Sequence, residues 1–100
     1  MEKLLPYCVY VLFSEKDHLL YIGFTSDLKR RLAEHNRGEC TSTKSRTPLK
    51  LIFFEYYLYK QDALNREAYF KTTMGKKALK IMMKKTLEKL GHKQTKAMAL

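Results

Sequence analysis

The chain has 100 residues, the size of one compact domain, and carries 20 Lys and Arg side chains against 10 Asp and Glu, a net charge of +10. That charge indicates an anionic partner, a nucleic acid or an anionic membrane surface, although it also suits a solvated surface that keeps the protein dissolved. The sequence has no run of about 20 apolar residues and no signal-peptide pattern, which argues against a membrane helix and against secretion. It also has no C-x-x-C pair, which argues against a structural zinc site and a disulfide scaffold. We therefore expect a cytoplasmic protein.

A hairpin of two strands is predicted near the start of the chain. Residues 7–13, YCVYVLF, and 19–24, LLYIGF, are rich in β-branched and aromatic side chains, and the polar residues between them can reverse the chain. If the turn centres on residues 15–16, Tyr10 and Tyr21 are cross-strand neighbours with Cβ atoms about 5 Å apart. A slip of one residue would put them on opposite faces of the sheet.

A first helix is predicted over residues 27–36, DLKRRLAEHN. Thr25 or Ser26 can cap its start, where the charge of Asp27 is also favourable, and Gly38 can end it.

The apolar stripe of this helix consists of Leu28 and Leu32. Arg31 and His35 lie three or four positions from these leucines or from each other, so both side chains should flank the stripe. An arginine there can extend from the edge of the core or bind a phosphate, and the histidine can simply favour the helix dipole.

The second half of the chain is predicted to contain one strand and two helices. A polar loop over 39–48 leads into a strand over 49–58, which we expect to be central because it is apolar on both faces. A helix follows from 62 to about 74, and a basic amphipathic helix from 77 to 90. We expect one domain over 1–90 and a flexible tail over 91–100.

Glu67 is the one acidic residue on the predicted apolar stripe of the helix over 62–74, whose other members are Ala63, Leu64, Phe70 and Met74. A buried carboxylate must pair, protonate or bind a metal. Pairing with Arg66 or Lys71 is the structural alternative. A single carboxylate also suits one magnesium ion that keeps most of its waters.

Taken together, these residues resemble the GIY-YIG nuclease family. Residues 8–10, Cys-Val-Tyr, stand where the first signature lies, with cysteine and valine in place of its glycine and isoleucine, and residues 21–23, Tyr-Ile-Gly, match the second in full. Arg31 follows at the family's usual interval, and Glu67 corresponds to the family's metal-binding glutamate. The resemblance spans roughly residues 7–83 and is closest to small stand-alone bacterial members.

The resemblance implies an α+β fold, in which a three-stranded antiparallel sheet is flanked by helices. It also implies an endonuclease that hydrolyses DNA phosphodiester bonds with one Mg²⁺ or Mn²⁺ ion, in DNA repair or recombination. DNA is a more expected substrate than RNA, no membrane is expected to be involved, and a partner protein is one way to target so small an enzyme.

Residue roles follow from the same resemblance. Glu67 would hold the metal, and Arg31 would stabilise the charge that develops on the phosphate. Tyr10 is the expected general base and Tyr21 the residue that positions water or phosphate, although the family's proposals differ on which phenol is the base. His35 would orient a tyrosine or share the proton transfer.

Three further residues are expected to contact nucleic acid. Gly23 would let the backbone approach a phosphate closely. Lys44 and Arg46, together with the last basic helix, would follow the phosphate backbone without reading bases.

Two other functions remain open at the level of sequence. A nucleic-acid-binding module that kept this fold and lost catalysis would explain the charge and the altered first signature. A small RNA-binding or ribosome-associated protein would use Tyr10 and Tyr21 as stacking platforms, but it leaves Glu67 unexplained.

Overall fold

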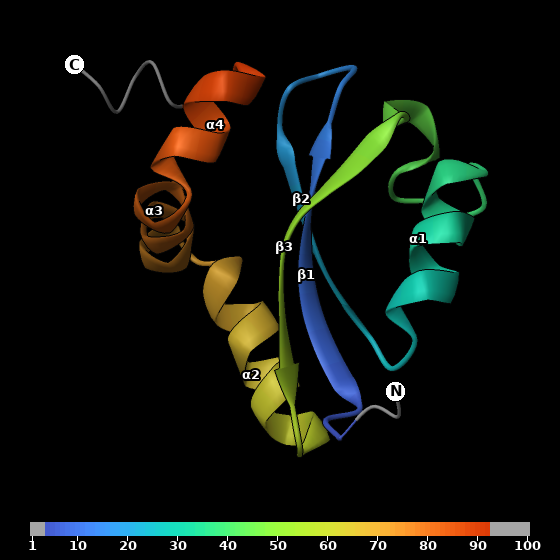
Figure 1. Cartoon of the computed structure of the whole chain (residues 1–100), viewed down its shortest axis with the longest axis vertical. Coiled ribbons are helices and arrows are strands. Elements are labelled where there is room, and N and C mark those ends of the chain that lie inside the picture. The colour runs from blue at the N-terminus through green and yellow to red at the C-terminus, as the bar shows by residue number, and fades with distance from the viewer. Residues whose placement is uncertain (1–3, 93–100) are drawn as a thin grey trace.

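A computed structural model describes residues 4–92 and shows one three-stranded antiparallel sheet between two layers of helices (Figure 1). The expected α+β fold is confirmed. The strands are β1 (Tyr7–Ser14), β2 (Leu20–Thr25) and β3 (Leu49–Tyr57). The helices are α1 (Leu28–Asn36) on one face and, on the other, α2 (Lys60–Phe70), α3 (Thr73–Met82) and α4 (Lys84–Leu90), and the short 3₁₀ turn η1 (Lys44–Arg46) precedes β3.

The central strand is β1, and the prediction that the third strand is central was wrong. The strand order is β2-β1-β3, so β3 pairs with β1 alone and forms an edge of the sheet. Both faces of β1 are covered, and every residue from Cys8 to Ser14 is buried. On β3, by contrast, Phe54 remains 49% exposed. Apolar composition on both faces therefore does not distinguish a central strand from an edge strand whose aromatic residues are half covered.

The register of β1 against β2 differs by two residues from the predicted one. Tyr10 lies opposite Gly23, and Tyr21 lies opposite Leu12. Because side chains alternate with a period of two, a shift of two positions keeps both tyrosines on one face. Their ring centroids are 6.4 Å apart.

The turn between β1 and β2 explains this register. The Ser14 N–H donates to the Leu19 carbonyl at 3.0 Å, so the turn centres one residue later than expected. Asp17 accepts from the Leu19 N–H at 2.9 Å and from the Arg46 guanidinium at 3.2 Å. The Ser14 hydroxyl donates to the Arg46 carbonyl at 2.6 Å. The sequence between the strands did not reveal this anchoring to η1.

The start of α1 is capped by Asp27, not by Thr25 or Ser26 as predicted. The Asp27 carboxylate accepts from the Arg30 N–H at 3.1 Å, while the Thr25 hydroxyl accepts from the Asp27 N–H at 3.0 Å. Gly38 follows the end of the helix with φ = +75°, as its predicted role requires.

The boundaries of the last three helices also differ from the prediction. α2 ends at Phe70, and Thr72 caps a new helix through a 3.0 Å bond from the Gly75 N–H. Gly75 lies inside α3, where a Cβ atom would collide with the Tyr69 carbonyl oxygen, so it permits close packing of the two helices. Met74, predicted to be in the core, is 68% exposed as a result.

The predicted basic helix over 77–90 is two helices, α3 and α4, which meet at Met83. Gly91 ends α4 with φ = +75°, and His92 is buried. The rest of the predicted tail, residues 93–100, lies outside the described residues.

Each face of the sheet has its own core. The core beneath α2–α4 is apolar and is built from Val9, Val11, Ile22, Ala63, Phe70, Leu79, Met83 and Leu87. The core beneath α1 contains Cys8, Tyr10, Leu12, Leu28 and Leu49. Successive residues of β1 thus serve opposite layers of the molecule.

Candidate active site

Four of the predicted catalytic residues come together on the α1 face of the sheet. Tyr10 projects from β1 and Tyr21 from β2, while Arg31 and His35 project from α1. The Tyr10 hydroxyl lies 2.8 Å from His35 Nε2. The His35 ring centroid is 5.7 Å from that of Tyr10 and 5.2 Å from that of Tyr21. His35 is fully buried, so it lies within this cluster on the buried side of α1, beside Leu28.

Gly23 makes room for the Tyr10 ring. A Cβ atom at position 23 would overlap the Cζ and hydroxyl atoms of Tyr10, its partner across the β1–β2 ladder. The residue is itself buried. In this structure the missing side chain of Gly23 therefore serves the placement of a phenol, a use that the sequence did not suggest.

Thr43 extends the cluster from the loop before β3. Its hydroxyl lies 2.7 Å from His35 Nδ1, and both side chains are fully buried. In the tautomer with a proton on Nδ1, His35 donates to Thr43 and accepts from the Tyr10 hydroxyl at Nε2. Because the Thr43 hydroxyl can accept a hydrogen bond, its position is compatible with the tautomer in which His35 can take a proton from Tyr10.

Burial controls the protonation of this pair. It raises the pKa of Tyr10 to about 12, against the opposing effect of the neighbouring Arg31 guanidinium. It also lowers the pKa of His35, and the positive charge of Arg31 acts in the same direction. At neutral pH the pair therefore consists of a neutral phenol and a neutral imidazole.

Arg31 lies between Tyr10 and a carboxylate of its own helix. One guanidinium nitrogen is 3.2 Å from Glu34, and the Tyr10 hydroxyl and Glu34 both raise the pKa of the arginine. The Arg31 side chain is 37% exposed, so the cation sits where the buried cluster meets solvent. The spacing of three residues between Arg31 and Glu34 is a signal that sequence reasoning could have used.

Tyr21 is the more accessible of the two phenols. Tyr10 is 1% exposed, whereas Tyr21 is only partly buried and its hydroxyl accepts from the Ser42 hydroxyl at 3.4 Å. Ser42 and Thr43 belong to a loop that lacks any periodic pattern, so no sequence signal pointed to them.

Glu67 belongs to the opposite layer of the molecule. It lies on α2, whose residues Ala63 and Phe70 pack on the other face of the sheet. Its side chain is 20% exposed and pairs with Lys71 at 3.1 Å, one of the partners that the sequence left open. The other, Arg66, instead pairs with Glu55 at 2.9 Å.

The two cations of the η1 turn differ in their surroundings. Lys44 is exposed. Arg46 is bound to Asp17, whose pKa it lowers to about 2, and to the Leu20 carbonyl at 3.3 Å. The guanidinium of Arg46 therefore holds the β1–β2 turn.

The model of the GIY-YIG catalytic domain matches residues 6–80, three quarters of the chain. The chain belongs to the GIY-YIG family. It is 34% identical over 88 residues to a UPF0213 protein of Clostridium perfringens, covering 86% of this chain and 92% of that one. It is 45% identical over 67 residues to a UPF0213 protein of Streptococcus agalactiae, covering 66% and 75% of the two chains. No solved structure matches.

A GIY-YIG catalytic domain is a nuclease domain, which acts on nucleic acid and generally depends on a divalent metal. Within residues 4–92, no three His, Cys, Asp or Glu side chains are grouped to hold an ion. Glu67, the predicted metal ligand, is a half-buried carboxylate whose partner Lys71 is 55% exposed. Such a site fits a single hard ion that takes its other ligands from water and phosphate.

None of the helices within residues 4–92 has the length and apolar character needed to cross a membrane.

Proposed function

We propose that this GIY-YIG protein is an endonuclease that hydrolyses phosphodiester bonds in DNA. The observation that carries the proposal is the 2.8 Å contact between the Tyr10 hydroxyl and His35 Nε2, with Arg31 at the solvent edge of the pair. A phenol, an imidazole and a guanidinium together supply what phosphodiester hydrolysis needs, which is proton transfer from water and stabilisation of phosphate charge.

We assign Tyr10 and His35 to proton transfer. With a pKa of about 12, Tyr10 is rarely ionised at neutral pH, so it needs an acceptor for its proton. The Nε2 lone pair of neutral His35 is that acceptor. The phenolate then takes a proton from the attacking water, whose oxygen forms a new bond to phosphorus as the bond to the leaving oxygen breaks.

We assign Arg31 and Tyr21 to the phosphate. The partly exposed Arg31 guanidinium can donate to the non-bridging oxygens, and Glu34 holds it near that position. The accessible Tyr21 hydroxyl can orient the phosphate or the water.

Glu67 is the proposed metal ligand, after Lys71 has moved away. A bound Mg²⁺ or Mn²⁺ ion would supply Lewis-acid stabilisation of charge on the non-bridging and leaving oxygens. Lys44 is the proposed contact to the flanking backbone, and Arg46 acts by fixing the turn behind it. We expect flapped or branched DNA of the kind formed in repair and recombination to be cut best, with a protein partner as a further source of targeting.

The test is cleavage of labelled single-stranded, duplex, flapped and branched DNA in Mg²⁺, Mn²⁺ or EDTA. Arg31→Ala and Glu67→Ala should each abolish metal-dependent cleavage. Arg30→Ala is the matched control for the arginine, because Arg30 is on the same helix with a side chain that is 64% exposed. Glu15→Ala serves the same purpose for the glutamate. Cleavage that survived both Arg31→Ala and Glu67→Ala would refute the site.

A catalytically inactive nucleic-acid-binding module is the second candidate function. Two observations favour it, namely the 1% exposure of Tyr10 and the pairing of Glu67 with Lys71 on the opposite layer. This alternative predicts DNA binding without cleavage in every metal, with affinity unaffected by Glu67→Ala.

A further inference from the structure

The α3 and α4 helices carry an unusual concentration of unpaired positive charge. Residues 73–92 contain a single acidic residue, Glu88, against six lysines: Lys76, Lys77, Lys80, Lys84, Lys85 and Lys89. Within residues 4–92 none of these lysines forms an ion pair, whereas Arg31, Arg37, Arg46 and Arg66 each contact a carboxylate. We call this set the α3–α4 lysines.

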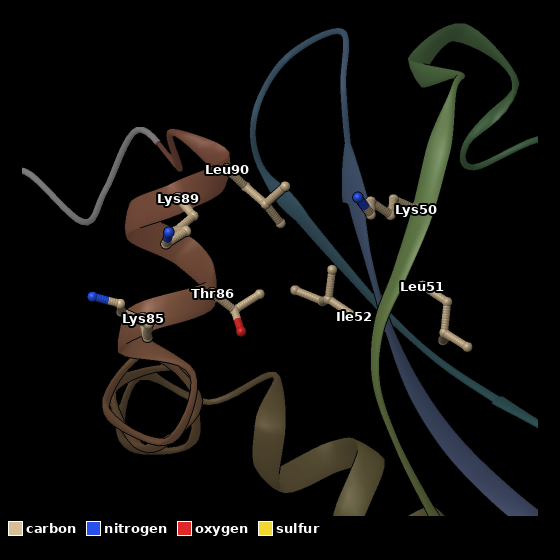
Figure 2. A pocket seen from close by; sticks show the side chains of 7 residues that line it. All are labelled: Lys50, Leu51, Ile52, Lys85, Thr86, Lys89 and Leu90. Atoms are coloured by element: carbon tan, nitrogen blue, oxygen red, sulfur yellow. The ribbon is translucent and has the colours of Figure 1, made fainter.

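A groove of about 400 Å³ runs between α4 and the edge strand β3 beside these lysines (Figure 2). Its lining includes Lys50 of β3 and Lys85 and Lys89 of α4. Figure 2 shows Ile52 of β3 pointing across the groove toward α4, while Leu51 points away to the other side of the sheet. The groove therefore combines an apolar floor with lysine side chains at its rim, where Lys85 of α4 points outward, away from β3.

A sugar-phosphate backbone matches this combination. Ammonium groups bind phosphate oxygens as point charges, and an apolar floor can contact the sugars between them. Partial burial lowers the pKa of Lys80, and the charges of Lys76 and Lys77 lower it further. The clustered lysines therefore repel one another. A polyanion would relieve that repulsion with release of its counterions.

The groove lies on the far side of the sheet from the cluster of Tyr10, Tyr21, Arg31 and His35. In Figure 1 the sheet separates α1 from α3 and α4. Leu87 of α4 packs on the same core as Val9 and Val11, whereas Leu28 of α1 packs with Tyr10. A straight segment of nucleic acid lying against α1 and the two phenols cannot also occupy the groove.

We propose that the α3–α4 lysines and the β3–α4 groove bind the backbone of a second nucleic-acid segment, apart from the segment at the active site. The inference rests on the proposed function only in placing a first segment against α1. A protein with two such surfaces holds two arms of a branched or sharply bent substrate, and this would give a single-domain nuclease a preference for such structures.

The test measures binding in EDTA, so that no cleavage is needed, with a labelled four-way junction and a linear duplex made from one arm. Lys85→Glu combined with Lys89→Glu should weaken junction binding about 10- to 100-fold. The slope of log affinity against log salt should become shallower by about 1 for each phosphate that the variant no longer neutralises. Duplex binding should change less. The charge-neutral pair Lys85→Gln and Lys89→Gln should show the same pattern with a smaller effect.

Lys60→Glu, compared with Lys85→Glu alone, is the control for net charge, because both lysines are exposed and helical and only Lys85 lines the groove. The proposal is overturned if the two single variants bind the junction equally well. It is also overturned if duplex and junction binding fall equally, which would mean that both substrates use one shared binding segment. A third contrary outcome is that the variants lose binding to phosphatidylserine vesicles while binding to nucleic acid is unchanged. Failure of the nuclease proposal would appear separately, as absence of cleavage in every metal while the binding differences persist.

Discussion

The two faces of the sheet use the same central strand for different purposes. Beneath α2–α4, Val9 and Val11 of β1 enter a core built from apolar side chains. Beneath α1, Tyr10 enters a core that also buries His35 and Thr43. The period of two along a strand thus separates side chains that stabilise the fold from side chains that can do chemistry, although they are consecutive in the chain.

The surface charges of the two layers differ in the same way. On the α1 side, the arginines are held by carboxylates, as Arg31 is by Glu34 and Arg46 by Asp17. On the α3–α4 side, the lysines are left unpaired within residues 4–92. The first arrangement fixes guanidinium groups in place, and the second leaves a positive surface without neutralising carboxylates. Substitutions matched across the two faces can test this division.

The largest effect is expected for Tyr10→Phe, which removes only the hydroxyl that contacts His35. Loss of a proton-transfer group should lower the cleavage rate by about 10²- to 10⁴-fold. Because His35 Nε2 stays buried without its partner, stability should fall by about 1–3 kcal/mol. Tyr69→Phe, on the opposite layer at an exposed position, should change neither rate nor stability. Equal cleavage rates for the two variants would remove Tyr10 from the mechanism.

Phe70→Ala should be the most destabilising change on the apolar face. Phe70 is fully buried, with its ring 5.9 Å from Phe53 and the Arg66 guanidinium 4.3 Å from its centroid. The cavity should cost about 3–5 kcal/mol in urea-induced unfolding. Phe54→Ala is the control from the other face, where the side chain is 49% exposed, and it should cost clearly less. Similar losses would contradict the assignment of the main core to the α2–α4 side.

Gly23→Ala should affect stability and cleavage together. The added Cβ overlaps the Tyr10 ring, which must shift away from its position beside His35. Overpacking of this kind costs about 1–3 kcal/mol. Because the double variant Gly23→Ala with Tyr10→Ala removes the collision, it should lose less stability than the two single changes added together. Additive losses in a denaturant-unfolding cycle would show that Gly23 does not act through Tyr10.

The smallest and most gradual effect expected is the dependence of stability on pH. It arises because each face of the sheet buries one histidine, His35 or His92. Burial lowers the pKa of His35, with Arg31 adding to the effect and Glu34 opposing it, and burial and Lys80 lower the pKa of His92. The unfolded chain therefore binds more protons than the native protein below about pH 6.5, so stability should fall there as pH drops, until the lowered native pKa is reached.

Unfolding curves between pH 5 and 8 should separate the two histidines. His35→Gln and His92→Gln should each flatten the acid side of the stability profile. Only His35→Gln should also remove the acid limb of the cleavage profile. A cleavage profile that changed equally in both variants would break the distinction between the two faces.

The sequence by itself determined the fold class, the hairpin, the helix that carries Arg31 and His35, and the membership of the GIY-YIG family. These features depend on periodicity and on short local signatures, which a chain expresses wherever it folds. It also placed Tyr10 and Tyr21 on one face in spite of a register error, because an error of two residues preserves the face.

The tertiary structure alone decided which strand is central, how the helix over 77–90 divides, and what surrounds each polar group. Thr43 and Asp17, which pair with His35 and Arg46, lie in loops whose sequences carry no periodic signal. The pKa of Tyr10 depends on burial beneath α1, and the placement of Glu67 in the layer opposite α1 depends on which face α2 covers. Contacts between segments distant in sequence set all of these properties, and no local pattern encodes such contacts.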